Sequence, residues 1–531
     1  MGGSSPGDPR RAVSNRQRLP ARRPAPPDPD ENETDDDDVT SSSTSSSASS
    51  SASSSPRFEW DPSDALASHA VLLGVLALGA TPWLQDQRYG YVPYFAALAL
   101  CSVYVGAHRG LAREDRENLT LAQTAVAPVA LSASLLLVYL LLRYTSLDIG
   151  ALVGAYFWLL GALATASAYA VPVGAALGAR ARDEVAFVVP VPEGLALDRE
   201  TGEPARELPV TYAAAVAAFV GFVAATADVA AHHENHTLNN FLATAIVADF
   251  LSLVGVGSFA AAAALGVGLL AYDAFWVFGS GAVFGDGTVD SNVMMAVATS
   301  DSFRGPFRLL FPRYDDVLDP IAPGVIPYSL LGLGDVAVPG LLACVALRYD
   351  ASRATDMGGR ARAAAAAFMN AFDDAWTRAD AASPTGVADR LDESVAAEAA
   401  DAADAAFDAA AEALGEGFAG SWSEGSGLEG SSGGSGYARA GSGAGDYATG
   451  TMTVPRSMGG RALFSSVMRA YAAGLATACW VNAATGVGQP ALVYLVPATL
   501  GGAMWTAHER DELPRLLAFK DEGRRRRGDG E

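Results

Sequence analysis

The chain has 531 residues, of which 50% are apolar, yet it carries a formal net charge of −23 at pH 7. A single soluble globule does not combine these figures, whereas apolar membrane-crossing segments joined by acidic loops do. The acidic balance argues against a nucleic-acid partner, because binding to phosphates needs a basic face. The three cysteines all fall in apolar segments, which indicates small buried side chains rather than a disulfide framework or a metal site.

Ten apolar runs follow a polar N-terminal tail, residues 1–57, that we expect to be disordered because it lacks apolar side chains. Each run is near the roughly 20 residues that cross a bilayer as a helix. The first run is compatible with a full crossing or with a shallow hairpin, so the side of the N-terminus stays open. The sequence therefore predicts an all-α polytopic protein of the lipid bilayer with nine or ten transmembrane helices. The runs are Ala65–Trp83, Val92–Ala107, Leu121–Leu142, Ile149–Val173, Val210–Val229, Leu238–Val256, Ser258–Phe278, Ile326–Leu347, Leu463–Ala484 and Pro490–Ala507.

Arginines orient this predicted bundle, since cytoplasmic loops carry an excess of basic residues. Three arginines between Asn292 and Tyr314 do not fit the pattern, but the majority puts the C-terminus and residues 351–461 in the cytosol. The loops and tail that carry clustered arginines are 109–116, 180–182, 348–362 and 524–527.

Residues 351–461 form an acidic insertion rich in Ala, Gly and Ser. Its first hundred residues hold 16 Asp and Glu against 6 Arg. The part Ala363–Ala382 favours a helix with an aromatic stripe, which would pack on a following helix or dock on a membrane surface or a partner. We expect a second helix up to Leu414 and a flexible linker over Gly415–Gly450.

Two aspartates lie where charge is costly, inside consecutive apolar runs. Asp273 follows Tyr272 in Ser258–Phe278, and Asp335 lies near the middle of Pro327–Leu347. A charged side chain in the hydrocarbon costs about 3 kcal/mol or more, so an acidic group there indicates function. Two carboxyl groups that meet in a low dielectric share one proton, and aspartic proteases use such a pair to activate water and polarise the scissile carbonyl.

Glycines precede the second aspartate, in the order Gly332, Leu333, Gly334 and Asp335. Without Cβ atoms, the backbone at these glycines lets another segment approach and lets a helix loosen locally. Taken alone, this motif of four residues has little specificity.

A third motif, Gln489-Pro490-Ala491-Leu492, opens the last apolar run. A proline at a helix start leaves neighbouring backbone groups free, and free backbone at membrane depth is tolerated only where protein or a water cavity covers it. Such backbone would be able to pair with an unwound substrate segment as an added strand. Considered in isolation, the motif is more simply explained as a proline in the first turn of a helix.

Together the three motifs resemble the intramembrane aspartyl proteases of the presenilin and signal peptide peptidase superfamily. The strings YDAFWVFG (272–279), LLGLGDVAVPG (330–340) and QPALVYLVPATLG (489–501) resemble signal peptide peptidase more than presenilin. The early region 65–110 resembles the plant-type enzymes. Weaker similarities are Leu238-Asn239-Asn240 and the string FRLLFP at 307–312.

This resemblance implies a presenilin-like bundle that needs no cofactor and no metal. It implies cleavage of signal peptides and other type II-oriented transmembrane peptide substrates within the endoplasmic reticulum membrane. Asp273 and Asp335 match the catalytic pair. The residues that match positions shaping the active site and binding substrate are Tyr272, Gly332, Leu333, Gly334, Gln489, Pro490, Ala491 and Leu492.

The resemblance also divides the chain. The expected parts are the tail 1–57, N-terminal transmembrane helices 58–256, the catalytic transmembrane pair 257–350, the insertion 351–461, C-terminal transmembrane helices 462–510 and a cytosolic tail 511–531.

Three departures from the family pattern limit this inference. Residues 281–291 look like an insertion between the two catalytic spans, 351–461 replaces a short connection, and the C-terminus lacks a dilysine retrieval signal. Retention in the endoplasmic reticulum, the natural substrates and a homo-oligomeric state therefore stay open. The alternative functions are a non-catalytic scaffold in membrane-protein degradation and a proton-coupled transporter or channel. A metal site in His232–His236 is disfavoured, because this stretch is a short interfacial connection.

Overall fold

The computed structural model describes residues 57–58, 60–113, 117–144, 150–190, 207–280, 283, 305–313, 328–382, 399–406, 409, 451–452, 461–485 and 489–521. All of them lie in one unit of the chain, Ser55–Glu531. The expected disordered tail 1–57, the insertion 281–291 and the linker 415–450 lie outside the described residues, apart from Arg57 and Val283.

Helices occupy nearly all of the predicted apolar runs. Trp83, which we predicted in the first run, lies instead in a separate short helix, because α1 ends at Gly79 and Pro82 begins a new turn. The long helices are α1 (Pro62–Gly79), α3 (Tyr91–Ala112), α4 (Leu121–Tyr144), α5 (Gly150–Leu177), α7 (Tyr212–Ala230), α8 (His236–Leu253), α9 (Phe259–Ala274), α12 (Gly334–Ala382), α14 (Ala462–Thr485) and α15 (Leu492–Glu509). The short ones are α2 (Pro82–Gln85), α6 (Ala179–Asp183), α16 (Leu513–Ala518) and a π-helix, η1 (Phe275–Gly279), that continues α9.

Six helices in the described residues are long and apolar enough to cross a membrane, judged by length and composition. They are α1, α3, α4, α5, α7 and the segment formed by α9 and η1. The other four predicted runs overlap with α8, α12, α14 and α15. The chain is thus mostly helical, as a polytopic membrane protein is expected to be, and the count of nine or ten spans stays a prediction.

Polar side chains set the points where several of these helices begin. Ahead of α1, the Asp61 carboxylate accepts a hydrogen bond from the Ser63 amide at 2.8 Å. Ser258 accepts one from the Ala261 amide at 3.1 Å ahead of α9, and Asn235 does the same for Thr237 ahead of α8. Such caps satisfy amides that have no partner within the helix, which matters most where no water can replace them.

Short strands are the main departure from the predicted all-α fold. The predicted run Ile326–Leu347 is not one helix, because Tyr328–Gly332 forms strand β7 and the helix begins only at Gly334. β7 pairs antiparallel with β6 (Arg308–Pro312), so the backbone groups of both strands find partners without a helix. Helix and strand are hard to distinguish in a short apolar run, and the pairing with β6 decides between them here.

The remaining strands form three small pairs. They are β1 (Arg57–Phe58) with β8 (Thr451–Met452), β2 (Glu117–Leu119) with β5 (Val254–Val256), and β3 (Val185–Pro190) with β4 (Glu207–Thr211).

Helix α12 carries the chain from the apolar run into the acidic insertion without a break. It spans 49 residues, passes the expected boundary at 350 and includes the predicted helix Ala363–Ala382. Part of the predicted second helix, residues 399–406, is helical as well.

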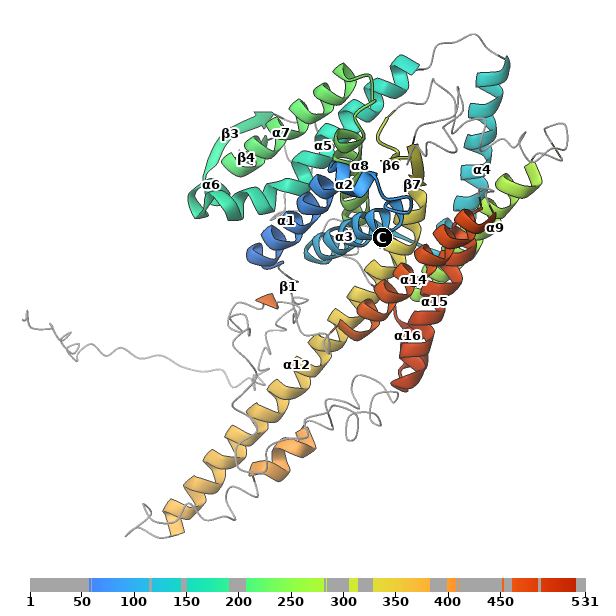
Figure 1. Cartoon of the computed structure of the whole chain (residues 1–531). Helices are drawn as coiled ribbons and strands as arrows, with labels where there is room; N and C mark the ends of the chain where they lie inside the picture. Colours follow the sequence, from blue (N-terminus) through green and yellow to red (C-terminus); the bar gives the residue numbers. More distant parts are fainter. Residues whose placement is uncertain are drawn as a thin grey trace, which may run out of the picture. The chain divides into compact units, whose positions relative to one another are not determined.

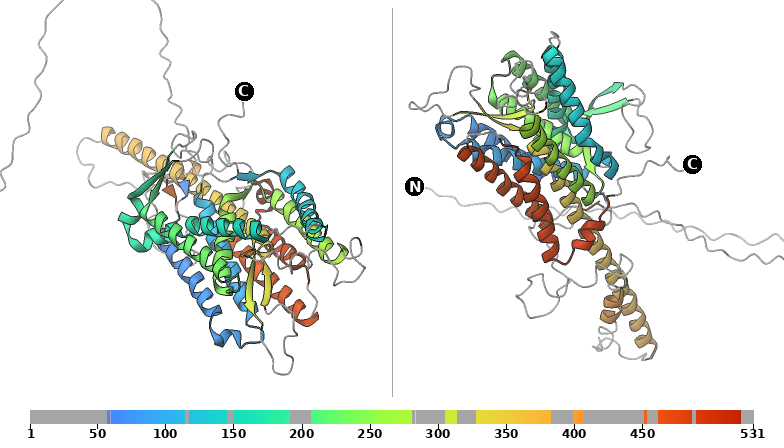
Figure 2. Two further views of the ribbon diagram at one scale, coloured as in Figure 1. Left: turned by 90° about the horizontal axis from the view of Figure 1, so that it is seen from above. Right: turned by 90° about the vertical axis from the view of Figure 1, so that its right-hand side faces the viewer.

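The largest core cluster lies where α3, α8, α9, α12, α14 and α15 contact one another (Figures 1 and 2). Leu251 of α8 lies between two glycines of this core. An added Cβ would lie 2.7 Å from Leu251 Cβ at Gly106 and 2.8 Å from Leu251 Cδ1 at Gly340, so α8 approaches α3 and α12 closely. In contrast, α4, α5 and α7 expose large apolar side chains such as Val129, Leu152 and Phe219, as helices facing lipid do.

Candidate active site

The three sequence motifs lie on three helices that contact one another. Asp273 lies near the end of α9, Asp335 in the first turn of α12, and Leu492 at the start of α15. Each of these helices contacts the other two, and Figure 1 shows α9 and α15 beside the upper part of α12. The fold therefore brings together residues that are up to 219 positions apart in the sequence.

Asp273 is buried, with 6% of its surface exposed, and it has a defined hydrogen-bond donor. The backbone amide of Leu492 donates to Asp273 Oδ2 at 3.3 Å. This amide is free because Leu492 begins α15, where the first amides of a helix have no partner in the preceding turn. The amino-terminal end of α15 also carries partial positive charge, which favours a carboxylate beside it. The proline motif and the first aspartate are therefore in direct contact.

Asp335 is partly buried, and its carboxyl group lies beside the Gly332 backbone, where an added Cβ would lie 3.4 Å from Asp335 Oδ2. The Asp273 carboxyl group is close enough to interact with it electrostatically. The Tyr471 hydroxyl, on α14, donates to the Asp335 main-chain oxygen at 3.0 Å. The two acidic side chains thus belong to one site, which we call the aspartate pair.

The residues before Asp335 make the change from strand to helix. The Leu333 amide donates to the Phe307 carbonyl at 3.3 Å, which extends the pairing of β6 and β7 by one step. The Leu333 carbonyl accepts from the Val336 and Ala337 amides, which belongs to the first turn of α12. A Cβ at Gly334 would meet no atom within 4 Å, so there is open space beside Asp335.

Two further predicted site residues lie next to these groups without contacting a carboxylate through any described hydrogen bond. Tyr272 is partly buried, and its ring centroid lies 6.4 Å from that of Trp276. Gln489, three residues before α15, accepts through Oε1 a hydrogen bond from the hydroxyl of Tyr494 in the first turn, at 3.3 Å. The roles that the sequence suggests for Tyr272, Gln489, Pro490 and Ala491 stay predictions.

The turn after Asp273 is a π-helix, Phe275–Gly279. Single π-turns inserted in α-helices are frequent at functional sites. Trp276 in this turn donates through Nε1 to Ser132 Oγ of α4 at 3.0 Å. Helix α4 therefore anchors the end of α9 that carries the first aspartate.

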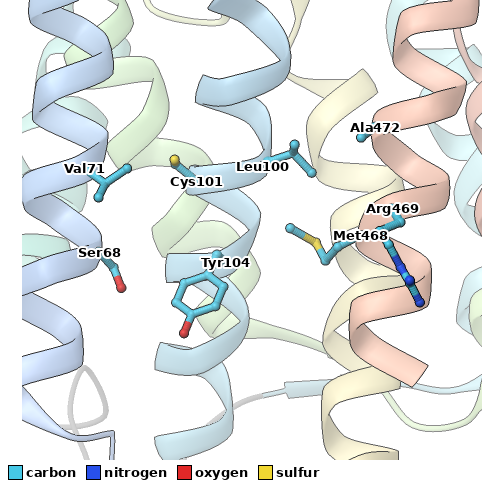
Figure 3. A pocket seen from close by; sticks show the side chains of 8 residues that line it. All are labelled: Ser68, Val71, Leu100, Cys101, Tyr104, Met468, Arg469 and Ala472. Atoms are coloured by element: carbon cyan, nitrogen blue, oxygen red, sulfur yellow. The ribbon is translucent and has the colours of Figure 1, made fainter. Parts of the chain in front are cut away.

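A pocket of about 440 Å³ lies elsewhere, between α1, α3 and α14 (Figure 3). It contains none of the predicted site residues, and the accessible surface of its lining is almost entirely apolar. Its lining residues are Ser68, Val71, Leu100, Cys101, Tyr104, Met468, Arg469 and Ala472.

In the histidine-rich connection before α8, one histidine pairs with an aspartate at the end of α7. His233 Nδ1 lies 2.7 Å from Asp228 Oδ2, and Asp228 is 1% exposed. In the part of the chain that the structure describes, no three His, Cys, Asp or Glu side chains are grouped as metal ligands would be.

Tyr471 is a site residue that the sequence did not indicate. It lies in an apolar run, 1% exposed, and nothing in its local pattern distinguishes it from a core tyrosine. Only the packing of α14 on α12 shows that its hydroxyl reaches the backbone of Asp335.

The fold and the site define a helical membrane protein with an acidic pair on adjacent helices. The family model described as signal peptide peptidase matches residues 112–369 and 447–523, which is more than half of the chain. The chain therefore belongs to the signal peptide peptidase family. The gap in the match falls within the predicted insertion, and the match leaves out α1 and most of α3.

Similar curated proteins carry the same family name. Signal peptide peptidase-like 1 of Oryza sativa subsp. japonica is 36% identical over 23% of this chain and 37% of its own length. Signal peptide peptidase of Homo sapiens is 34% identical over 22% of this chain and 26% of its own length. Signal peptide peptidase-like 3 of Arabidopsis thaliana is 40% identical over 15% of this chain and 13% of its own length. The chain thus spans between an eighth and somewhat over a third of these relatives, and no solved structure matches it.

Proposed function

We propose that this chain is an aspartic endopeptidase that cleaves peptide bonds within the membrane, with Asp273 and Asp335 as its catalytic residues. The observation that carries this proposal is that α9, α12 and α15 contact one another and bring the Asp273 carboxyl group to the first amide of α15, within electrostatic range of Asp335. Membership of the signal peptide peptidase family supports the same reaction.

The aspartate pair suits hydrolysis without a metal ion. Two neighbouring carboxyl groups share one proton, since both cannot be ionised cheaply in a low dielectric. The ionised one accepts a proton from water as the water oxygen attacks the scissile carbonyl carbon, and the protonated one donates a hydrogen bond to the carbonyl oxygen. When the tetrahedral intermediate collapses, the C–N bond breaks and the leaving amine takes the proton that the carboxylate accepted from water, which restores the pair. The Leu492 amide supports Asp273 as the carboxylate that takes the proton from water.

The substrate must be locally unwound before this reaction, because the carbonyls of a helix are hydrogen-bonded. In the described residues β7 pairs with β6 on one edge, and no strand pairs with its other edge. We propose that an extended substrate segment pairs with β7, and that backbone around Pro490 and Ala491 contacts the same segment. Substrates with residues that weaken helices are expected to be cleaved fastest.

The natural substrates that this site would accept are signal peptides and type II-oriented transmembrane segments, and the membrane would be that of the endoplasmic reticulum. The arginine distribution supports a cytosolic C-terminus. Neither alternative, the scaffold nor the proton-coupled transporter, is favoured by the family membership.

The test uses the purified full-length chain in detergent with a type II signal-peptide reporter. Wild-type protein is expected to release two fragments, and an aspartyl inhibitor that mimics the transition state should block the release. Asp273→Asn and Asp335→Asn should each lower the rate by more than about a thousand-fold, because each removes a proton-transfer group. Robust cleavage by either variant would refute the assignment, provided that the variant inserts and folds like the wild type.

A further inference from the structure

Two adjacent asparagines at the start of α8 bind strand β6 through their side chains. Asn239 and Asn240 are 1% and 0% exposed, so neither amide is satisfied by bulk solvent. Asn239 Nδ2 donates to the Arg308 carbonyl at 2.7 Å. The proposed mechanism gives these two residues no contact with substrate. They lie on α8, which contacts α12, the helix that carries Asp335.

Asn240 makes a two-point contact with the main chain of β6. Its Oδ1 accepts from the Leu310 amide at 2.7 Å, and its Nδ2 donates to the Leu310 carbonyl, also at 2.7 Å. The side-chain amide of Asn240 therefore binds both the N–H and the C=O of Leu310, as the backbone of a neighbouring strand would. Nδ2 also donates to the Tyr94 hydroxyl at 3.0 Å.

These contacts cover the outer edge of β6. In an antiparallel pair the amide and carbonyl of every second residue point away from the partner strand. Arg308 and Leu310 are two residues apart, and both direct a carbonyl to an asparagine rather than to β7. An unpaired edge inside a membrane protein is costly, because no water is available to satisfy it. The asparagine side chains supply the missing partners.

A continuous series of backbone contacts leads from this edge to the second aspartate. Across the sheet, Leu310 pairs with Leu330 and Arg308 with Gly332. The next step is the hydrogen bond from the Leu333 amide to the Phe307 carbonyl. An added Cβ at Gly332 would lie 3.4 Å from Asp335 Oδ2, so the Asp335 carboxyl group lies beside the end of β7. The position of β6 therefore determines where the strand ends and where α12 begins.

We propose that Asn239 and Asn240 are positioning residues for the aspartate pair, acting as a latch that fixes β6, and through β7 the backbone that orients Asp335. The expected effect on cleavage rests on the proposed protease function. The expected effect on the positions of β6 and β7 does not. The hydrogen bonds that the latch must make explain why asparagine occupies these positions. An amide offers both a donor and an acceptor without charge, whereas a charged side chain near the aspartate pair would alter its electrostatics.

The catalytic test compares variants of Asn240 in the full-length protein with the signal-peptide reporter. Asn240→Asp keeps the size and shape of the side chain but loses the donor to the Leu310 carbonyl. We expect it and Asn240→Ala to lower kcat by about ten- to a hundred-fold, since a displacement near 1 Å at a catalytic group has effects of this size. KM should change by less than about three-fold. Asn240→Gln, which retains both hydrogen-bonding groups, should retain more activity than either.

Matched controls separate the latch from a general need for a buried polar side chain. Thr244 lies one turn further along α8, is 1% exposed, and donates to the Phe241 carbonyl within its own helix. Thr244→Val should leave kcat within about two-fold of the wild type. Asn239→Ala should have a smaller effect than Asn240→Ala, because it removes a single main-chain contact. A kcat for Asn240→Asp equal to that of the wild type would refute the proposal, as would an equal loss for Thr244→Val.

Amide hydrogen exchange gives a readout that does not depend on catalysis. In Asn240→Asp, amides in 305–313 and 328–333 should exchange faster than in the wild type, while those in α14 and α15 should not change. Unchanged exchange in the two strands would overturn the latch. If the wild type cleaved no reporter but the strands exchanged faster in Asn240→Asp, the protease proposal would fail while the latch would stand.

Discussion

The apolar part of α12 has polar groups around each of its two ends, but the polar groups at one end are neutral and those at the other end are charged. Near its start, at Asp335, the polar groups are neutral: the Leu492 amide that faces Asp273, the Tyr471 hydroxyl and the asparagine amides that hold β6. At its other end lie Arg348, Asp350 and Arg353, which we call the charged end.

The charged end ties three distant parts of the chain together. Arg348 pairs with Asp521 of the C-terminal segment at 2.8 Å, and Arg353 pairs with Glu512 at 2.7 Å. The Asp350 carboxylate accepts from the amides of Leu463 and Phe464, in the first turn of α14, at 3.3 and 2.9 Å. This carboxylate serves as an N-cap supplied by a different helix, across the whole of the acidic insertion.

The difference follows from where charge is tolerated. Ionised side chains are stable near the membrane boundary, where water and opposite charges are available, and costly within the hydrocarbon. In the proposed mechanism the aspartate pair shares one proton, and neutral groups beside it do not shift that proton as a nearby charge would. The comparison predicts that changes near the aspartate pair reduce catalysis, whereas changes at the charged end reduce stability.

Apart from the two aspartates themselves, the largest effect is expected for the amide that faces Asp273. Leu492→Pro removes that N–H but leaves a residue that helices tolerate in the first turn. Loss of a hydrogen bond to an ionised group costs about 1.5–3 kcal/mol, so we expect kcat to fall by roughly ten- to a hundred-fold. Leu492→Ala, which keeps the amide, is the control and should lose much less in the same reporter assay. Equal activity of the two variants would show that this amide has no catalytic role.

The charged end is tested at Asp350. Asp350→Ala removes the acceptor for two amides of α14 and should lower the free energy of unfolding by about 2 kcal/mol. Asp350→Asn keeps an acceptor and should lose about half of that or less. Thermal unfolding in detergent measures both. If Asp350→Ala abolished cleavage by protein that is still folded and equally stable, the division between the two ends would be wrong.

The contact between α4 and the π-turn after Asp273 should have a smaller effect. Trp276→Phe removes the hydrogen bond to Ser132, worth about 1 kcal/mol, so cleavage should fall by about five-fold if the loss is felt in the transition state. Ser132→Ala should cause a similar loss. The double variant should be no worse than either single one, because both remove the same interaction. Additive losses would mean that the two side chains act separately.

The smallest effect is expected for the acidic insertion. Asp350 and Phe464 are hydrogen-bonded, so the two ends of the insertion meet, and a short connection is able to join them. We predict that replacing residues 357–458 with about ten Gly and Ser residues changes kcat by less than two-fold and stability by little, as loop-closure entropy varies slowly with length. A large loss of cleavage would instead assign the insertion a role in the reaction.

The two aspartates and the proline motif of the candidate site could be predicted, because each is recognised from its near neighbours in the sequence. An aspartate inside an apolar run is visible without a structure, since burial of charge is costly wherever the run folds. Pro490 likewise indicated a helix start, and α15 does begin at Leu492. In contrast, β7 was missed because Tyr328–Gly332 is apolar enough for a helix, and its state depends on a partner strand about 20 residues away.

The sequence by itself determined that this chain forms apolar helices, that Asp273 and Asp335 lie within two of them, and that the family is that of signal peptide peptidase. Only the tertiary structure decided that the Leu492 amide reaches Asp273, that Tyr471 holds the backbone of Asp335, and that Asn240 covers the edge of β6. The physical reason is the range of the interactions. The cost of burying a charge and the preference for a helix depend on near neighbours in the sequence. A hydrogen bond between segments 70 to 219 residues apart depends on how the whole bundle packs.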